Sequence, residues 1–242
     1  MTGRRTFTIP GGGLNQSQAK AFTECPHKWW LRYVDGHGTE PSDAQRLGSL
    51  CHEFFGTMAL AKEHDKPPSL QSTLTQYNNR ARELGITKGK AHGESMLIAY
   101  YQWLEHADLV GGTIKCYEVQ LEYKGLRGTL DFIASYKGEL TIIDWKTSLR
   151  GWDPADAIWL PQAWMYILLA RGNGIPVVSF HYHIVTKIPT SRVVVLEVKP
   201  LKMELDRWEQ VFKEMSQEMK RKTNYRRIGP HCDRCNVQDH CA

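Results

Sequence analysis

The sequence predicts one α/β domain in which a central mixed β-sheet is flanked by helices. Two observations lead to this prediction. The hydrophobic period changes along the chain from helical to strand-like and back. The order of elements is helices, a three-stranded meander, a helix, two strands and a final helix, which fits a sheet covered by helices.

The first part of the chain is predicted to be helical after a flexible leader at 1–13, which ends in three glycines. Apolar residues at helical spacing predict four helical segments, the first interrupted near Pro26, at 17–34, 43–64, 70–84 and 93–109.

Short segments rich in β-branched and aromatic residues then predict an antiparallel meander with strands at 115–123, 127–136 and 139–145. Beyond it the pattern predicts a helix, two strands and a helix at 154–171, 177–185, 192–198 and 201–222. No internal repeat and no linker interrupts this order, so residues 14–242 are predicted to form one domain.

Composition excludes several classes of protein. The 242 residues include 41% hydrophobic and 10% aromatic residues, which argues against a disordered chain. No window approaches the roughly eighteen consecutive apolar residues of a membrane span, and no apolar segment follows the two N-terminal arginines. We therefore expect a cytoplasmic protein without a secretory signal. The net charge of +5 is a weak indication of a nucleic-acid partner.

The most informative stretch is the second hairpin of the meander. If Lys137-Gly138 forms a two-residue turn, Ile133 lies opposite Ile142 and Asp131 lies opposite Asp144. The reverse face of the hairpin is then predicted to carry the pairs Leu130/Trp145, Phe132/Ile143 and Ala134/Thr141. These are nearly all apolar, which places the hairpin in the middle of the sheet.

Two aspartates in this position call for a counter-charge. Directly opposed like charges are destabilising, and neighbouring buried isoleucines raise the cost of ionising them. A divalent cation turns the repulsion into a binding site, and hard carboxylate oxygens suit Mg²⁺ or Mn²⁺. Lys146 shares the face of Asp144 and could orient a water or stabilise charge on a phosphate. Glu118 is a candidate additional ligand or base. The alternative is that the aspartates are solvated edge charges.

Three further residues gain meaning only in combination. His52 lies on the second predicted helix, and Gln162 and Tyr166 share one face of a later helix. Taken singly, a helical histidine is more often structural than a ligand, and Gln162 and Tyr166 would be surface polar residues or a core tyrosine.

In the order of its motifs the sequence resembles the RecB-like branch of the PD-(D/E)XK nuclease superfamily: Gly48-x3-His52, Glu118, Gly128-x2-Asp131, Asp144-Trp145-Lys146 and Gln162-x3-Tyr166. The resemblance implies a restriction-endonuclease-like core. It further implies metal binding by His52, Asp131 and Asp144, and catalysis by the two aspartates with Lys146. Gln162 and Tyr166 would contact DNA or orient the site.

The C-terminal segment carries the spacing C-x2-C-x5-C at Cys232, Cys235 and Cys241. Three thiolates need a fourth partner for a zinc site or a cubane cluster, and Cys25 is the candidate. The pattern resembles the iron–sulfur nucleases of the same superfamily, which include the CRISPR-associated Cas-four exonucleases and the AddB-type nuclease domain. This implies that the four cysteines hold a [4Fe–4S] cluster that joins the two ends of the domain. Histidines in the same segment keep Zn²⁺ open as the alternative.

A mixture of cations and aromatic rings follows Cys25: Lys28, Trp29, Trp30, Arg32 and Tyr33. This composition suits stacking on unpaired bases, although the two tryptophans could equally pack around the cluster.

Together these features predict a metal-dependent DNA exonuclease that acts on single-stranded or frayed ends in the cytoplasm of a bacterium or phage-infected host. Its context would be recombination, repair or processing like that of CRISPR adaptation, with protein partners from those processes. Two alternatives stay open: a DNA-end-binding module of a larger complex, and a structure-specific endonuclease.

Overall fold

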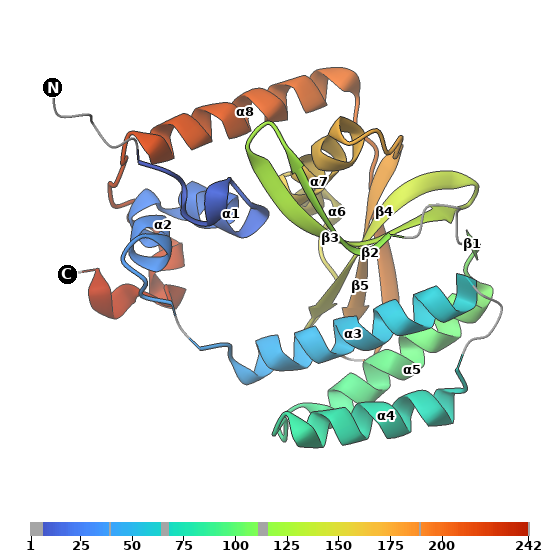
Figure 1. Ribbon diagram of the computed structural model, residues 1–242. Coiled ribbons are helices and arrows are strands. Elements are labelled where there is room, and N and C mark those ends of the chain that lie inside the picture. Colours follow the sequence, from blue (N-terminus) through green and yellow to red (C-terminus); the bar gives the residue numbers. More distant parts are fainter. Residues whose placement is uncertain (1–6, 39, 64–67, 111–115, 189, 242) are drawn as a thin grey trace, which may run out of the picture.

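A mixed β-sheet separates two groups of helices in the computed structural model, which describes residues 7–38, 40–63, 68–110, 116–188 and 190–241 (Figure 1). Within these residues the sheet has six strands, in the order β1-β3-β4-β5-β6, with β2 also pairing with β3. The strands are β1 Leu109–Val110, β2 Cys116–Tyr123, β3 Leu126–Tyr136, β4 Glu139–Ser148, β5 Ser179–Thr186 and β6 Val193–Val198. β4 and β5 are parallel and the other pairs are antiparallel, so the predicted mixed sheet is confirmed.

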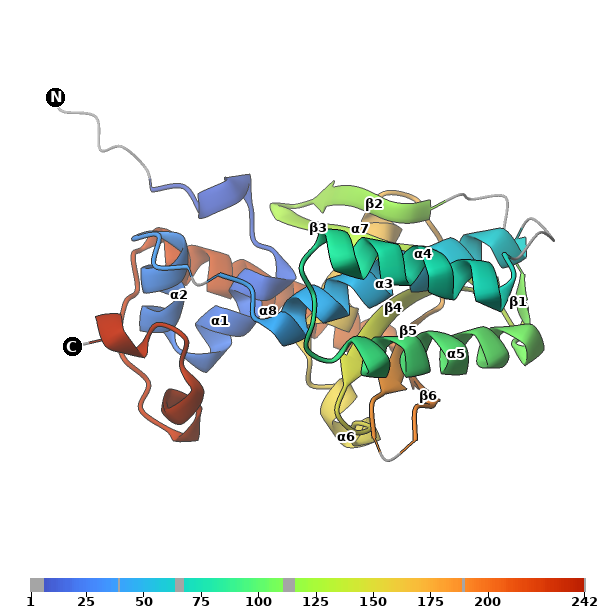
Figure 2. The ribbon, with the colours of Figure 1, turned by 90° about the horizontal axis from the view of Figure 1, so that it is seen from below.

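The helices form a layer on each face of the sheet and a separate group at one end (Figures 1 and 2). α3, α4 and α5 cover one face, and α7 and α8 cover the other. α1 and α2 lie beside the C-terminal segment. Their bounds are α1 Gln16–Glu24, α2 Pro26–Tyr33, α3 Asp43–Glu63, α4 Leu70–Glu83, α5 Lys90–His106, α6 Pro154–Ala157, α7 Pro161–Gly172 and α8 Lys202–Lys220. Short 3₁₀ turns lie at Pro10–Gly12, Pro230–Arg234 and Gln238–His240.

Two hydrophobic clusters hold these layers together. Ile142 belongs to the cluster under α7 and α8, and its neighbour Ile143 belongs to the cluster under α3, α4 and α5. This alternation is expected for a central strand with both faces buried. Among the described residues, no helix has the length and apolar character needed to cross a bilayer.

Proline explains two of the helix boundaries. The predicted interruption near Pro26 is confirmed, because Cys25 has extended dihedral angles and separates α1 from α2. The single helix predicted over 154–171 is wrong: α6 and α7 are separate, and Leu160 between them is extended. The residue before a proline is sterically disfavoured from helical geometry, and Pro161 then begins the new helix.

The other differences concern short segments. The helix predicted to reach residue 109 ends at His106, and Leu109–Val110 instead forms β1 on the edge of β3. Part of the predicted leader is ordered against the domain, since Ile9 is buried in the core beneath α7 and α8. The predicted start of the meander at residue 115 lies outside the described residues.

One buried group makes stability depend on pH. His183 on β5 is fully buried between Trp103 and Tyr136, and neither ring nitrogen has a hydrogen-bond partner. Burial, followed by the charge of the neighbouring His181, lowers the pKa of His183 to about 3. The unfolded chain binds this proton below about pH 6.5, whereas the folded chain does not. The free energy of unfolding therefore falls as the pH decreases through this range.

We expect His183→Phe to reduce this loss of stability by at most about 1.4 kcal/mol per pH unit, the contribution of one proton. Urea unfolding between about pH 5 and pH 7 measures the slope. His92→Gln, at an exposed histidine, serves as the control and should leave the slope unchanged. An unaltered slope in His183→Phe would show that other groups dominate the acid sensitivity.

Candidate active site

The site forms where β3 and β4 separate. The predicted register is confirmed, because Ile133 pairs with Ile142, but the ladder ends at Phe132 and Ile143. Asp131 is the next residue on β3, so it is not part of a regular cross-strand pair with Asp144 as predicted. On the other side of Asp131, Glu118 of β2 has a positive φ of 51°. β2 and β4, the two neighbours of β3, therefore both depart from regular strand geometry beside Asp131.

Because of the same distortion, the predicted reverse face of the hairpin is wrong in one position. Leu130 was expected to lie on the face of Phe132, but it packs with Ile133 in the cluster under α7. Strict alternation would place Leu130 and Ile133 on opposite faces. The alternation is therefore broken at Asp131 and Phe132, where β3 leaves β4 and remains paired with β2.

Asp131 is held by a backbone donor and faces a histidine. Its Oδ2 accepts a hydrogen bond from the backbone N–H of Trp145 at 3.2 Å, and Nδ1 of His52 on α3 lies 3.6 Å from the same oxygen. The side chain of Asp131 is 24% exposed, so the site opens to solvent here. The indole of Trp145 in turn donates to the hydroxyl of Tyr100 at 2.8 Å in the core.

Asp144 is almost completely buried, and its two oxygens have different partners. Nε2 of Gln162 donates to Oδ1 at 2.6 Å. Nζ of Lys146 forms a close ion pair with Oδ2 at 2.6 Å. Each oxygen of this buried carboxylate thus has one polar partner and keeps a lone pair for a further ligand.

The surroundings of both carboxylates disfavour their charged forms. Burial raises the pKa of Asp131 to about 8, with the charge of Asp144 as the next cause. Burial also raises the pKa of Asp144, although Lys146 and Gln162 oppose it. Burial, followed by the charge of Lys146, lowers the pKa of His52 far below its usual value. The imidazole is thus neutral at physiological pH and can offer a lone pair.

Tyr166 and Glu118 lie at the margin of this group. Tyr166 is one turn beyond Gln162 on α7, and its ring packs against Gly128, where a Cβ would lie 2.9 Å from Cε1. Burial raises the pKa of the Tyr166 phenol, and the charges of Asp144 and Asp131 add to the effect, so it remains protonated. Glu118 is exposed, and its charge contributes less to the pKa of Asp131 than that of Asp144 does.

The residues of the carboxylate site suit a metal ion that takes its remaining ligands from waters and from the substrate. Among the described residues, no three or more His, Cys, Asp or Glu side chains are arranged to hold a metal ion. Mg²⁺ commonly takes only one or two carboxylates and fills its remaining positions with waters and substrate phosphates. The remaining lone pairs of the Asp144 carboxylate and the raised pKa of Asp131 fit such a partial site.

A groove of about 1050 Å³ leads to Lys146 and Gln162. It is lined by α1, α2, the loop before α7 and the C-terminal segment, and its walls include Lys20, Arg32 and Arg234. The sequence pattern gave no signal for Lys20 or Arg234, because the groove joins segments that are far apart in the chain.

The cysteine-bearing ends of the chain meet at one residue. The backbone N–H of Arg227 donates to Sγ of Cys25 at 3.3 Å, and Sγ of Cys232 lies 3.9 Å from the carbonyl of Arg227. Cys235 and Cys241 lie in the turns that follow. The structure thus brings the two ends together, and a shared cluster on the four cysteines stays a prediction.

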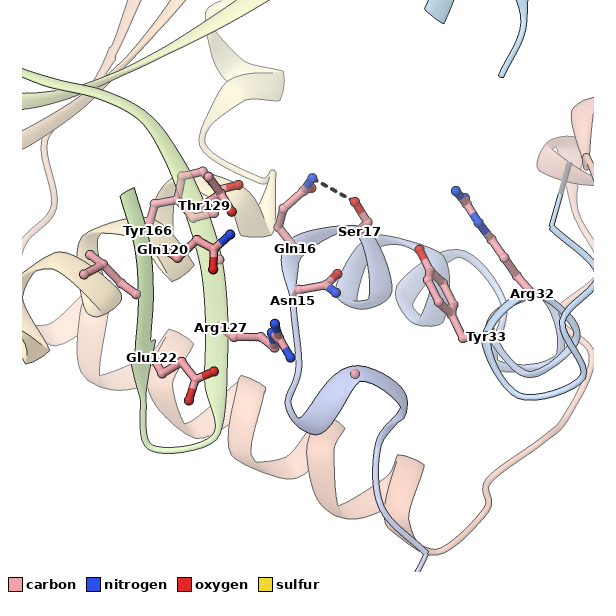
Figure 3. A pocket seen from close by; sticks show the side chains of 13 residues that line it. Asn15, Gln16, Ser17, Arg32, Tyr33, Gln120, Glu122, Arg127, Thr129 and Tyr166 are labelled. Atoms are coloured by element: carbon pink, nitrogen blue, oxygen red, sulfur yellow. Dashed lines mark hydrogen bonds between the residues drawn. The ribbon is translucent and has the colours of Figure 1, made fainter. Parts of the chain in front are cut away.

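The aromatic rings after Cys25 are mostly used in packing. Trp29 is completely buried and meets Phe22 edge to face, while Trp30 stacks on Phe7. Neither ring is freely available for base stacking. Arg32 and Tyr33, by contrast, line a cavity beside the site (Figure 3).

The family model of the PD-(D/E)XK nuclease superfamily matches residues 13–242. The chain belongs to this superfamily. No curated protein matches it by sequence. A crystal structure from Eubacterium rectale, described as a "putative exonuclease", shares 14% identity and a TM-score of 0.59 over 96% of this chain and 88% of that one. The structure of SSO0001 shares 15% identity and a TM-score of 0.39 over 78% and 94%. The first similarity supports the restriction-endonuclease-like fold of this superfamily member.

We expect Asp131→Asn to stabilise the metal-free nuclease domain by on the order of 1–2 kcal/mol, since it removes one of two buried like charges. Asp144→Asn should gain less, because it leaves the ammonium group of Lys146 without its counter-charge. Thermal melting in a chelating buffer measures both. Added Mg²⁺ or Mn²⁺ should raise the melting temperature of the unaltered protein but not that of Asp131→Asn. Equal destabilisation by the two variants would contradict this electrostatic interpretation.

Proposed function

We propose that the protein is an Mg²⁺- or Mn²⁺-dependent deoxyribonuclease that removes nucleotides from DNA ends. The observation that carries the proposal is the meeting of Asp131, Asp144 and Lys146 at the point where two strands separate, beside an open groove. Superfamily membership supports phosphodiester cleavage. The description of the Eubacterium rectale structure as a "putative exonuclease" supports the choice of exonuclease over endonuclease.

Asp131 and Asp144 would hold the divalent cation, with His52 as a neutral nitrogen donor. When bound, the cation supplies Lewis-acid stabilisation of the charge that develops on the phosphate. Glu118 is too exposed to be essential to this group and would act only as an additional acid.

The remaining residues position the reactants. In the hydrolysis, water attacks phosphorus, the bond from phosphorus to the leaving oxygen breaks, and that oxygen takes a proton. The Lys146 ammonium lies where it can orient the water or stabilise the phosphate charge. Gln162 fixes Asp144 through its amide N–H, and Tyr166 lines the cavity beside the site as a neutral phenol.

Removing the ammonium group tests the proposal most directly. We expect Lys146→Ala to reduce Mn²⁺-dependent degradation of end-labelled DNA by on the order of 100-fold or more, while DNA binding is retained. Lys137→Ala, in an exposed turn of the meander, is the matched control and should retain activity.

Two other outcomes would favour a different function. Equal, negligible turnover by the unaltered protein and Lys146→Ala, with both binding DNA, indicates an end-binding module. Cleavage of circular DNA at the rate of linear DNA indicates an endonuclease.

For the cysteines we propose a [4Fe–4S] cluster on Cys25, Cys232, Cys235 and Cys241, with Zn²⁺ as the alternative. The contact of Cys25 and Cys232 with the same residue, Arg227, supports it. Such a cluster closes a loop of roughly two hundred residues, and the entropic stabilisation grows with the logarithm of loop length. Recombination, repair or CRISPR-adaptation-like processing in the cytoplasm, with its protein partners, is the context that this pairing of sites suggests.

Cys232→Ala is expected to lower the melting temperature and the protease resistance of the whole domain, because the ends lose their crosslink. Iron, sulfide and zinc are measured after anaerobic purification, together with visible absorbance. Cys51→Ala is the control: Cys51 is buried in the α3 core, so its loss should leave the metal content unchanged. A Cys232→Ala protein with unchanged melting and metal content would refute the crosslink.

A further inference from the structure

A second cavity, of about 560 Å³, lies between the β2–β3 hairpin and helices α1 and α2 (Figure 3). Its volume is in the range of pockets that enclose a small ligand. Thr129 and Arg127 face it from β3, Gln120 from β2, and Arg32 and Tyr33 from the end of α2. None of these residues belongs to the motifs that define the carboxylate site.

This cavity is continuous with the groove that leads to the carboxylates. Gln16, Ser17 and Arg32 line both spaces. The groove contains Lys146, whereas the cavity is bounded by Tyr166, which packs near the carboxylates from α7. A chain molecule that occupies both spaces therefore passes the proposed catalytic group.

The cavity offers cationic groups that no protein side chain neutralises. Within the described part of the chain, the guanidinium of Arg127 has no ion pair or hydrogen bond. Arg32 lies over the ring of Tyr33 at 5.2 Å from its centroid. Glu122 is the cross-strand neighbour of Arg127 but forms no ion pair with it. Two guanidinium groups against one carboxylate leave the lining positive, and the planar fork of arginine matches a phosphate.

The far side of the cavity is closed by the main chain. The segment that leads into α1 is fastened to the hairpin, because Leu14 N–H donates to the Gly125 carbonyl and Arg127 N–H donates to the Leu14 carbonyl, both at 2.9 Å. The approach is tight, since a Cβ on Gly13 would lie 2.8 Å from the Gly125 oxygen. In Figure 3 Arg127 points toward this segment. A strand that enters from the groove meets this wall.

We propose that this cavity receives the phosphate-bearing end of a single DNA strand, with Arg127 binding the terminal phosphate. The proposal rests on the nuclease function proposed above and deepens it by naming the substrate end. The main chain bounds the cavity on one side, which favours a strand end over a strand that continues past the segment before α1. The chemical class of the ligand is a terminal phosphomonoester on an unpaired strand.

Binding in a chelating buffer tests the cavity without relying on cleavage. Fluorescence anisotropy compares short single-stranded oligonucleotides that carry a 5′-phosphate, a 3′-phosphate or only hydroxyl ends. We expect Arg127→Gln to weaken binding of one phosphate-ended strand about tenfold, as for the loss of one charge-assisted hydrogen bond, and to change binding of the hydroxyl-ended strand little.

Glu122→Gln provides the opposite test, because removing this carboxylate should strengthen binding of the same phosphate-ended strand. A variant that merely misfolds cannot produce such a gain. Lys137→Gln removes an exposed cation in the other hairpin and is expected to have no effect on the preference for a phosphate end.

The proposal is overturned if Arg127→Gln binds all three strands like the unaltered protein, or if it weakens them equally. It is also overturned if circular single-stranded DNA competes as well as the phosphate-ended strand. If only the proposed nuclease function is wrong, the result differs. The protein then still prefers a phosphate-ended strand, and this preference depends on Arg127, but it shows no DNA cleavage that depends on Lys146.

Discussion

The organising constraint of this protein is a pair of carboxylates that the fold keeps close together and largely away from water. Asp144 lies in the middle of the sheet with parallel β5 beside it, and Asp131 lies where β3 leaves β4. Neither position suits a free negative charge. Gln162 and Lys146 partly compensate Asp144, and a backbone N–H partly compensates Asp131. The remaining imbalance is what the proposed divalent cation would neutralise.

The helices around the sheet serve this pair from opposite sides. His52 reaches Asp131 from α3, whereas Gln162 reaches Asp144 from α7. The site is thus assembled across the sheet and depends on both hydrophobic clusters. The third wall comes from α1, α2 and the C-terminal segment, which meet at Arg227 and border the groove. Joining the ends of the chain therefore shapes the approach to the carboxylates as well as stabilising the domain.

Much of the fold and of the candidate site could be predicted from the sequence, because these features depend on local rules. The turn at Lys137-Gly138 defined the register of the hairpin, and the order of motifs selected residues that the fold brings together. The break at Asp131 was not predictable, since a strand pattern carries no information about where its two neighbours diverge. The break in the helix predicted over 154–171 was predictable in principle from Pro161. The cavity at Arg127 was not, because it depends on how the segment before α1 crosses the hairpin.

Trp145 connects the carboxylate pair to the interior. Its backbone N–H holds Asp131, and its indole donates a hydrogen bond to Tyr100 of α5 in the cluster under α3, α4 and α5. A shift of α5 would rotate the indole and carry the amide with it. Substitutions that repack α5, whether by evolution or by engineering, would therefore change the distance between Asp131 and Asp144 without altering any residue that lines the groove.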